Sequence, residues 1–93
     1  MGKIYKDDYN TVIDLDVGED ISTASTYRIY YEKPSGATGY WTASLQGTSI
    51  VRYTTVNGDL DEAGVWSLQA RVTTASGLWR GETVKVRVYD AFE

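Results

Sequence analysis

Apolar and polar residues alternate one by one along residues 65–73, and this period of two constrains the fold more than any other feature of the chain. The even-numbered positions of this segment are all apolar: Trp66, Leu68, Ala70 and Val72. The odd-numbered positions after Val65 are polar: Ser67, Gln69, Arg71 and Thr73. A strand with this pattern buries one face and exposes the other. We therefore predict a central strand over residues 65–73, with Trp66, Leu68 and Val72 in the core.

Shorter alternating segments cover residues 11–17, 25–33, 39–45 and 83–89, and each is bounded by turn residues. Residues 49–56 are ambiguous because both phases contain apolar side chains, and we favour Val51, Tyr53 and Thr55 as the inward set. Asn57-Gly58 predicts a turn. Residues 59–64 read as a compact loop with room for one helical turn, and residues 77–81 read as a loop between the last two strands.

This arrangement predicts an all-β domain. Of the 93 residues, 37 are β-branched or aromatic, the types that suit a pleated and half-buried surface. Six or seven strands with turns every ~8–12 residues are typical of a small antiparallel sandwich. Residues 1–93 are too few for a second core, so we expect a single domain. Trp41 and Val86 join the expected core on the inward phases of their strands.

The composition removes most catalytic chemistry. The chain has no Cys and no His, which excludes disulfides, a thiolate nucleophile, a Ser-His-Asp relay and the usual zinc sites. No glycine-rich phosphate loop is present. We expect a non-catalytic protein without cofactor or metal. One alternative stays open, since Asp59, Asp61 and Glu62 could supply oxygens to calcium, although capping of a turn explains them more simply.

Charge and hydropathy argue against nucleic acid and membrane partners. The chain has 9 basic and 13 acidic residues, a net charge of −4, and its lysines and arginines form no dense cluster along the sequence. No apolar run approaches the roughly 20 residues of a membrane helix. The first ten residues, MGKIYKDDYN, lack the apolar centre of a signal peptide. We expect neither nucleic acid nor membrane as a partner.

Four aromatic residues are left over once the core is assigned. Tyr30, Tyr40 and Tyr89 fall on outward phases, and Trp79 falls in the expected loop. Flat rings anchor protein interfaces and stack on sugars, so these residues form a candidate contact surface. The alternative is that they cover cross-strand neighbours or sheet edges.

Residues 61–68, DEAGVWSL, resemble the corner that leads into the F strand of immunoglobulin-like sandwiches. The aromatic residue of that corner is usually tyrosine, and Trp66 lacks the phenolic hydroxyl that bonds back to the chain. The cysteines of antibody domains are also missing. The resemblance implies an immunoglobulin-like antiparallel β-sandwich of about seven strands, outside the antibody family.

A wider resemblance covers nearly the whole chain. It rests on IDLD at 13–16, residues 29–31, KPSG at 33–36, Trp41, residues 50–55, GVWSLQA at 64–70 and GETV at 81–84. This order is similar to small uncharacterised bacteriophage and prophage proteins, and more distantly to the N-terminal domain of phage tail baseplate upper proteins.

The phage resemblance implies a structural part of the virion, associated with the tail or baseplate. Such a part contacts other phage structural proteins or copies of itself, and is found in the virion or, during assembly, in the bacterial cytoplasm. It supplies no catalytic residues. The alternative function is a carbohydrate-binding module for receptor recognition, in which Tyr40 and Trp79 form a stacking platform for a glycan.

Overall fold

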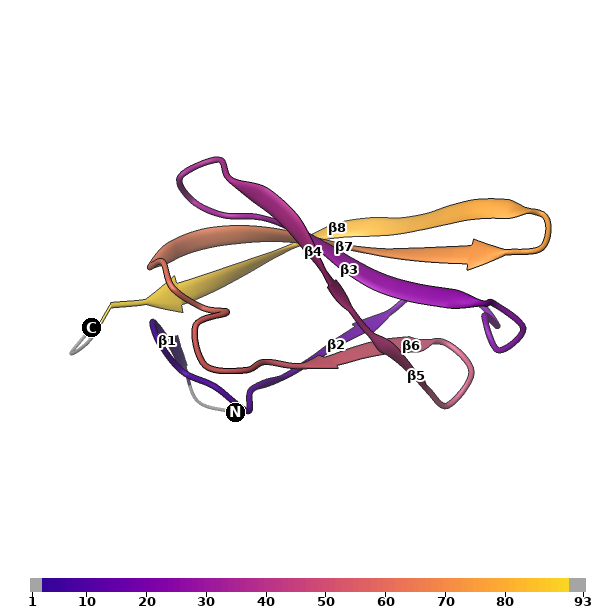
Figure 1. Ribbon diagram of the computed structural model, residues 1–93, viewed down its shortest axis with the longest axis horizontal. Helices are drawn as coiled ribbons and strands as arrows, with labels where there is room; N and C mark the ends of the chain where they lie inside the picture. Colours follow the sequence, from indigo (N-terminus) through magenta and orange to yellow (C-terminus); the bar gives the residue numbers. More distant parts are fainter. Residues whose placement is uncertain (1–2, 91–93) are drawn as a thin grey trace.

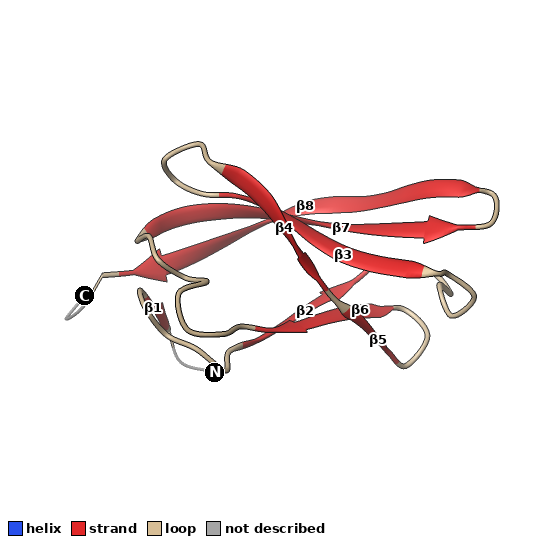
Figure 2. Ribbon diagram, viewed as in Figure 1, coloured by secondary structure: helices blue, strands red, loops and turns tan. Residues whose placement is uncertain are grey.

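A computed structural model of the chain describes residues 3–90, which form strands and connecting loops with no helix (Figure 2). The eight strands are β1 (Ile4–Tyr5), β2 (Val12–Asp16), β3 (Thr26–Glu32), β4 (Thr38–Thr42), β5 (Ser44–Gln46), β6 (Ile50–Thr54), β7 (Gly64–Thr74) and β8 (Gly77–Tyr89). The expected all-β class is confirmed. The structure has eight strands, where about seven were expected. The two short strands that were not expected are β1, with 2 residues, and β5, with 3 residues.

The strands form two sheets, in agreement with a β-sandwich (Figure 1). The larger sheet has the order β1-β8-β7-β3-β4, and the smaller has the order β2-β6-β5. All pairings are antiparallel except that of β1 with β8, which is parallel and limited to Ile4–Val88 and Tyr5–Tyr89. The expectation of a purely antiparallel sandwich is therefore wrong at this one pair. A parallel partner of β8 has to come from far away in the sequence, here from the start of the chain.

The segment expected as one strand over residues 39–45 contributes to both sheets. Its first part, β4, pairs with β3 in the larger sheet, and its second part, β5, pairs with β6 in the smaller one. Ala43 lies between them, and its N–H still donates to the carbonyl of Tyr27 in β3. Figure 1 shows β4 and β5 as one nearly continuous diagonal that crosses from sheet to sheet. This crossing closes one side of the core.

The core lies between the sheets and follows the predicted phases. Trp41, Trp66, Leu68 and Val72 are all buried. Val86 is half-buried and packs against the core. In β6, Val51 is buried and Tyr53 packs against the core, and Thr55 just after it is buried. The favoured inward set of residues 49–56 is thus confirmed.

Four aromatic rings from both sheets meet at Trp41. Its ring stacks on Tyr53 of the smaller sheet, with centroids 4.9 Å apart and an interplanar angle of 8°. The Tyr31 ring lies 4.8 Å from it and the Trp66 ring 6.2 Å. Aromatic pairs contribute about 0.5–1.5 kcal/mol each beyond the area they bury. This cluster joins the sheets where the chain crosses between them.

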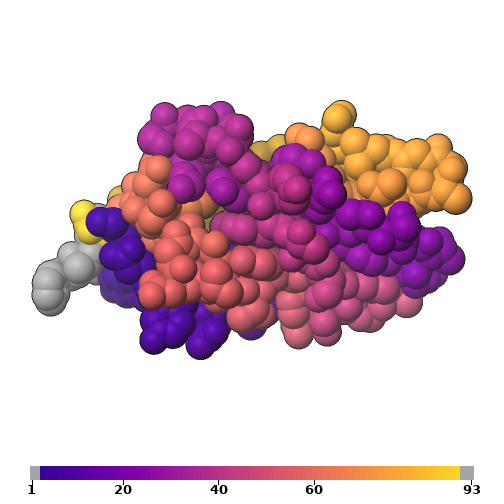
Figure 3. Space-filling model, viewed as in Figure 1, coloured from indigo at the N-terminus to yellow at the C-terminus, as the bar shows by residue number. Residues whose placement is uncertain are grey.

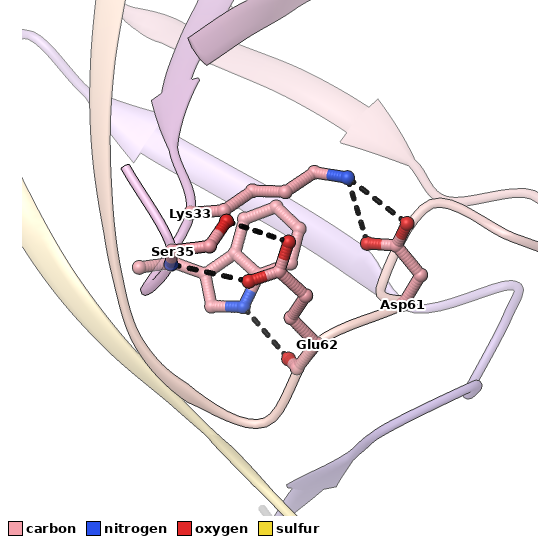
Figure 4. Close-up of polar contacts among 5 residues, drawn as sticks. Lys33, Ser35, Asp61 and Glu62 are labelled. Atoms are coloured by element: carbon pink, nitrogen blue, oxygen red, sulfur yellow. Dashed lines mark hydrogen bonds and ion pairs between the residues drawn. The ribbon is translucent and has the colours of Figure 1, made fainter. Parts of the chain in front are cut away.

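The corner before β7 is tied to the β3–β4 hairpin. The Trp66 indole N–H donates to the carbonyl oxygen of Glu62, at 3.0 Å. Figure 4 shows Lys33 reaching Asp61, with Nζ–Oδ1 at 2.8 Å, and Ser35 reaching the Glu62 carboxylate, with Oγ–Oε2 at 2.9 Å. The KPSG hairpin and the DEAGVWSL corner are therefore in contact.

The last strand begins earlier than the sequence predicts, and residues 77–81 are not a loop. β8 starts at Gly77, and Trp79 lies within it, opposite Val72 of β7. The register places Gln69 opposite Thr83 and Arg71 opposite Arg80, which leaves Ala70 facing the two residues Gly81 and Glu82. This arrangement is a β-bulge, and bulges often contain glycine. The long hairpin reaches one end of the elongated molecule, which measures 45 × 26 × 20 Å (Figure 3).

Candidate functional site

The outer face of the larger sheet holds a pair of tyrosines that face away from the core. Tyr30 in β3 lies directly opposite Tyr40 in β4. Their ring centroids are 5.2 Å apart, with an interplanar angle of 33°. Tyr40 is 48% exposed, and Tyr30 is half-buried by its neighbours. Two of the four aromatic residues predicted as a contact surface are therefore adjacent.

Each tyrosine ring is covered by an arginine. The guanidinium carbon of Arg71 lies 3.9 Å from the Tyr30 ring centroid, and that of Arg28 lies 4.5 Å from the Tyr40 centroid. Arg28 and Arg71 are direct cross-strand neighbours, a position in which like charges repel. The two cation–π contacts, typically worth about 0.5–2 kcal/mol each, offset that repulsion.

Gln69 fixes the orientation of one arginine. Its Oε1 accepts a hydrogen bond from Arg71 Nε at 3.1 Å, and its Nε2 donates to the carbonyl oxygen of Gly81, also at 3.1 Å. Gly81 belongs to the bulge in β8, so the bulge supports the side chains beside it. We name the set Arg28, Tyr30, Tyr40, Gln69 and Arg71 the tyrosine–arginine face.

The tyrosine–arginine face is positively charged although the chain has a net charge of −4. Within residues 3–90, no carboxylate forms an ion pair with Arg28 or Arg71. Lys85 adds a further cation to this side of the sheet, where its Nζ donates to Ser67 Oγ at 2.7 Å. The face therefore offers aromatic area together with two guanidinium groups that form no ion pair within residues 3–90.

A groove of about 390 Å³ borders the tyrosine–arginine face. Besides Tyr30, Gln69 and Arg71, its lining includes Glu32 and Thr38. The groove thus presents an aromatic ring beside a carboxylate, an amide, a guanidinium and a hydroxyl. This combination can form hydrogen bonds to a polar ligand that also contacts the tyrosine ring.

The other two predicted contact residues lie elsewhere. Trp79 is opposite Val72 on the inner side of the larger sheet and packs partly against the core, so it and Tyr40 are on opposite faces. The predicted platform of Tyr40 with Trp79 is therefore wrong, because Trp79 belongs to a strand and its position in that strand turns it inward. Tyr89 is half-buried beside Tyr5, with ring centroids 6.1 Å apart.

The carboxylates considered for calcium are used within the chain. Asp59 accepts from the Tyr53 hydroxyl at 2.6 Å and from the Val56 N–H at 2.8 Å, and Asp61 and Glu62 bind the β3–β4 hairpin. Burial, and then the bond to Asp59, raise the pKa of Tyr53 to about 12. Across residues 3–90, no cluster of three or more acidic, His or Cys side chains is arranged to hold a metal ion.

Asp14 and Asp16 lie on the outward face of β2. Asp14 forms a bidentate pair with Arg52 of β6, at 2.7 and 2.9 Å. The hydrogen bond from Arg52 holds the pKa of the Asp14 carboxyl below its usual value. Asp16 Oδ1 accepts from the Gly18 N–H at 2.9 Å.

Comparison with protein-family models, with curated proteins and with solved structures finds no match to this chain. The part of the chain that the structure describes also has no helix with the length and apolar character needed to cross a membrane.

Proposed function

We propose that this protein is a non-catalytic interaction domain that binds a protein partner through the tyrosine–arginine face. The observation that carries the proposal is the stacking of Arg28 and Arg71 on two outward tyrosines without an ion-pairing carboxylate in residues 3–90. Tyrosine and arginine are, with tryptophan, the residues enriched at the energetic centres of protein interfaces. An acidic surface on the partner would supply the missing charge.

We propose further that the domain belongs to a bacteriophage or prophage particle, as a component of the tail or baseplate. Support comes from the resemblance of the KPSG, GVWSLQA and GETV segments to phage proteins. On this proposal the partners are other phage structural proteins or copies of the chain itself. The protein would then occur in the virion and, during assembly, in the bacterial cytoplasm.

An immunoglobulin-like topology is part of the same proposal. The order β2-β6-β5 corresponds to strands B-E-D of that fold, and β8-β7-β3 corresponds to G-F-C. The bond from Trp66 Nε1 to the Glu62 carbonyl supports the comparison, because it occupies the place of the tyrosine corner.

Incorporation into particles tests the phage proposal. After phage growth is induced in the source strain, mass spectrometry of purified particles should detect this chain as a component. Tyr40→Ala and Arg71→Glu should each reduce its incorporation, because they remove an anchoring ring and reverse a charge. Tyr9→Ala is the matched control, since Tyr9 is 60% exposed and lies outside the tyrosine–arginine face. Particles that lack the chain, or incorporation unchanged in both variants, would contradict the proposal.

The groove beside Tyr30 supports a second candidate function, the binding of a carbohydrate. A sugar in contact with the Tyr30 ring could bond to Glu32, Gln69 and Arg71 in the groove wall. Nuclear magnetic resonance titration with a panel of glycans should then shift the amides of β3 and β7, and Tyr30→Ala should abolish these shifts. A monomeric protein that responds to a glycan would favour this function, and self-association without any response would remove it.

A further inference from the structure

One edge of the smaller sheet has backbone groups that no described strand pairs with. β2 pairs with β6 alone. The Val17 N–H donates to Ser49 O, and the Thr55 N–H donates to Thr11 O, so the odd-numbered residues of this segment bond toward β6. Because antiparallel ladders alternate, the N–H and C=O groups of Val12, Asp14 and Asp16 point away from β6. They form a free edge of the kind that accepts an added strand.

A groove runs along this free edge, between β2 and β8. Its volume is about 550 Å³, and its lining extends from Asp14 to Gly18 on one wall and from Trp79 to Glu82 on the other. Leu15, Ala70, Trp79 and Val84 give it an apolar floor. Val84 is 41% exposed although it lies on the inner side of its sheet, opposite Leu68. The groove therefore exposes inner-face apolar surface next to unpaired backbone.

The rim of the groove is acidic. Asp16 and Glu82 line opposite walls, and Arg80 is the one cation among the lining residues. Asp14 adds a carboxylate whose charge is compensated by Arg52. A strand added to β2 would place its outward side chains beside Asp14 and Asp16, where lysine or arginine is favoured. Its inward side chains would meet the apolar floor.

The same charges argue against a second copy of the chain as the occupant. An antiparallel pairing of β2 with β2 of another copy, with Leu15 kept on the inner side, brings aspartates beside aspartates on the outer side. Like charges in that position destabilise a sheet. A partner with basic residues at alternate positions has no such cost.

We propose that the groove between β2 and β8 binds an extended segment of another protein, which adds to β2 as a strand. The segment alternates apolar residues, which point into the groove, with lysine or arginine, which lie beside Asp14 and Asp16. This site is separate from the tyrosine–arginine face, which lies on the outer side of the other sheet, so either proposal can fail without the other.

The test is a selection from an unbiased library of displayed peptides that are about as long as β8. Peptides that bind should alternate apolar and basic residues and lack proline. In hydrogen exchange by nuclear magnetic resonance, the selected peptide should slow the exchange of the Asp14 and Asp16 amides by about tenfold or more. The Ile13 and Leu15 amides, which face β6, should change little. This alternation is specific to strand addition.

Two variants test whether the selected peptide binds in the groove between β2 and β8. Val84→Lys puts a cation on the groove floor and should weaken binding of the selected peptide by about tenfold or more. Val65→Lys is the control, because Val65 is 47% exposed on the outer face of the same hairpin and should leave affinity unchanged. Circular dichroism checks that both variants fold. The hydrogen-exchange experiment is carried out on the unmodified protein and so does not depend on either variant.

Three outcomes would overturn the proposal. The first is a selection that recovers no binding peptide. The second is binding that leaves the Asp14 and Asp16 amides unprotected or persists in Val84→Lys. The third is protection of those amides in the free protein as its concentration rises, which would assign the groove to a second copy. In contrast, Tyr40→Ala should not affect peptide binding.

Discussion

Trp66, near the start of β7, combines two ring contacts with one hydrogen bond. Its ring is 1% exposed and lies 5.6 Å from Tyr31 and 6.2 Å from Trp41, while its N–H bonds to the Glu62 carbonyl. Trp66→Ala should lower the free energy of unfolding by about 3–5 kcal/mol, since it leaves a cavity in the aromatic cluster. Urea denaturation followed by circular dichroism measures this loss. A domain of this size has only about 5–15 kcal/mol to lose.

Trp66→Phe separates the bond from the packing. It retains an aromatic ring and removes the indole N–H, so the part of the loss due to the hydrogen bond should be about 0.5–1.5 kcal/mol. A loss under about 1 kcal/mol for Trp66→Ala itself would show that the ring contributes little to the core.

Tyr53 should make the free energy of unfolding decrease as the pH rises into the alkaline range. Its pKa is raised to about 12 in the folded state, first by burial and then by the bond to Asp59, from an ordinary value of 10.0. Above pH 10 the unfolded chain releases this proton and the folded chain retains it, so the folded state binds more protons. Stability is therefore fully present below pH 10 and should fall by up to about 1.4 kcal/mol per pH unit as the pH rises toward 12.

Tyr53→Phe isolates this effect from the ionisation of other groups. The variant lacks the hydroxyl, so its stability should decline less steeply than that of the unmodified protein when urea midpoints are compared at increasing alkaline pH. Parallel curves for the two proteins would show that the Tyr53 hydroxyl does not titrate as inferred.

At the scale of elements, the β3–β4 hairpin packs against the start of β7 so closely that there is no space for a side chain at Gly64. Gly64 has a φ of +130°, and a Cβ atom at this position would lie 2.7 Å from Pro34 Cγ. Gly64→Ala should therefore destabilise the fold by at least about 1–3 kcal/mol through backbone strain, with an added cost from the clash. Thermal unfolding followed by circular dichroism measures the change.

Gly36→Ala is the control for backbone strain alone. Gly36 also has a positive φ, +94°, but a Cβ there would meet nothing within 4 Å. Its loss of stability should be smaller, and Pro34→Ala should recover part of the loss in Gly64→Ala. Equal losses in the two glycine variants would mean that the hairpin moves aside freely.

The strands with strict alternation and the turn at Asn57-Gly58 were predictable, but the glycines of residues 77–81 led to the wrong prediction of a loop. Residues 65–73 gave the right strand and phase because each inward position is apolar. Gly77 and Gly81 suggested a loop, yet the first closes a hairpin turn and the second sits in a bulge inside β8. A glycine in the sequence does not distinguish a turn from a bulge, because both use the conformational freedom of the glycine backbone.

The candidate site was predictable in part for a related reason. The outward phases of Tyr30 and Tyr40 followed from the period of two, but their pairing depends on which strands are neighbours and in what register. Arg28 and Arg71 were outward in the same pattern, and only the pairing of β3 with β7 brings each onto a tyrosine. Alternation within a strand carries no information about its neighbour.

At the scale of the whole molecule, the sheets join local hairpins through pairings between segments that are distant in the sequence. β2 pairs with β6, β3 pairs with β7, and β1 pairs with the end of β8, so the first and last described strands are neighbours. Each pairing closes a long loop before its contacts form, which makes folding slow. Refolding should take milliseconds to seconds, as measured by stopped-flow tryptophan fluorescence. A relaxation in microseconds would contradict this expectation.

The pairing of β1 with β8 closes the longest loop and should form last. Ile4 packs against the core and pairs with Val88, so Ile4→Ala removes contacts of that late step. The substitution should then speed unfolding and leave the refolding rate nearly unchanged, because an interaction absent from the transition state affects only the unfolding limb. Leu68→Ala, in the centre of β7, is the comparison and should slow refolding if β7 nucleates the larger sheet. A refolding rate that falls in Ile4→Ala as much as its unfolding rate rises would place β1 in the nucleus instead.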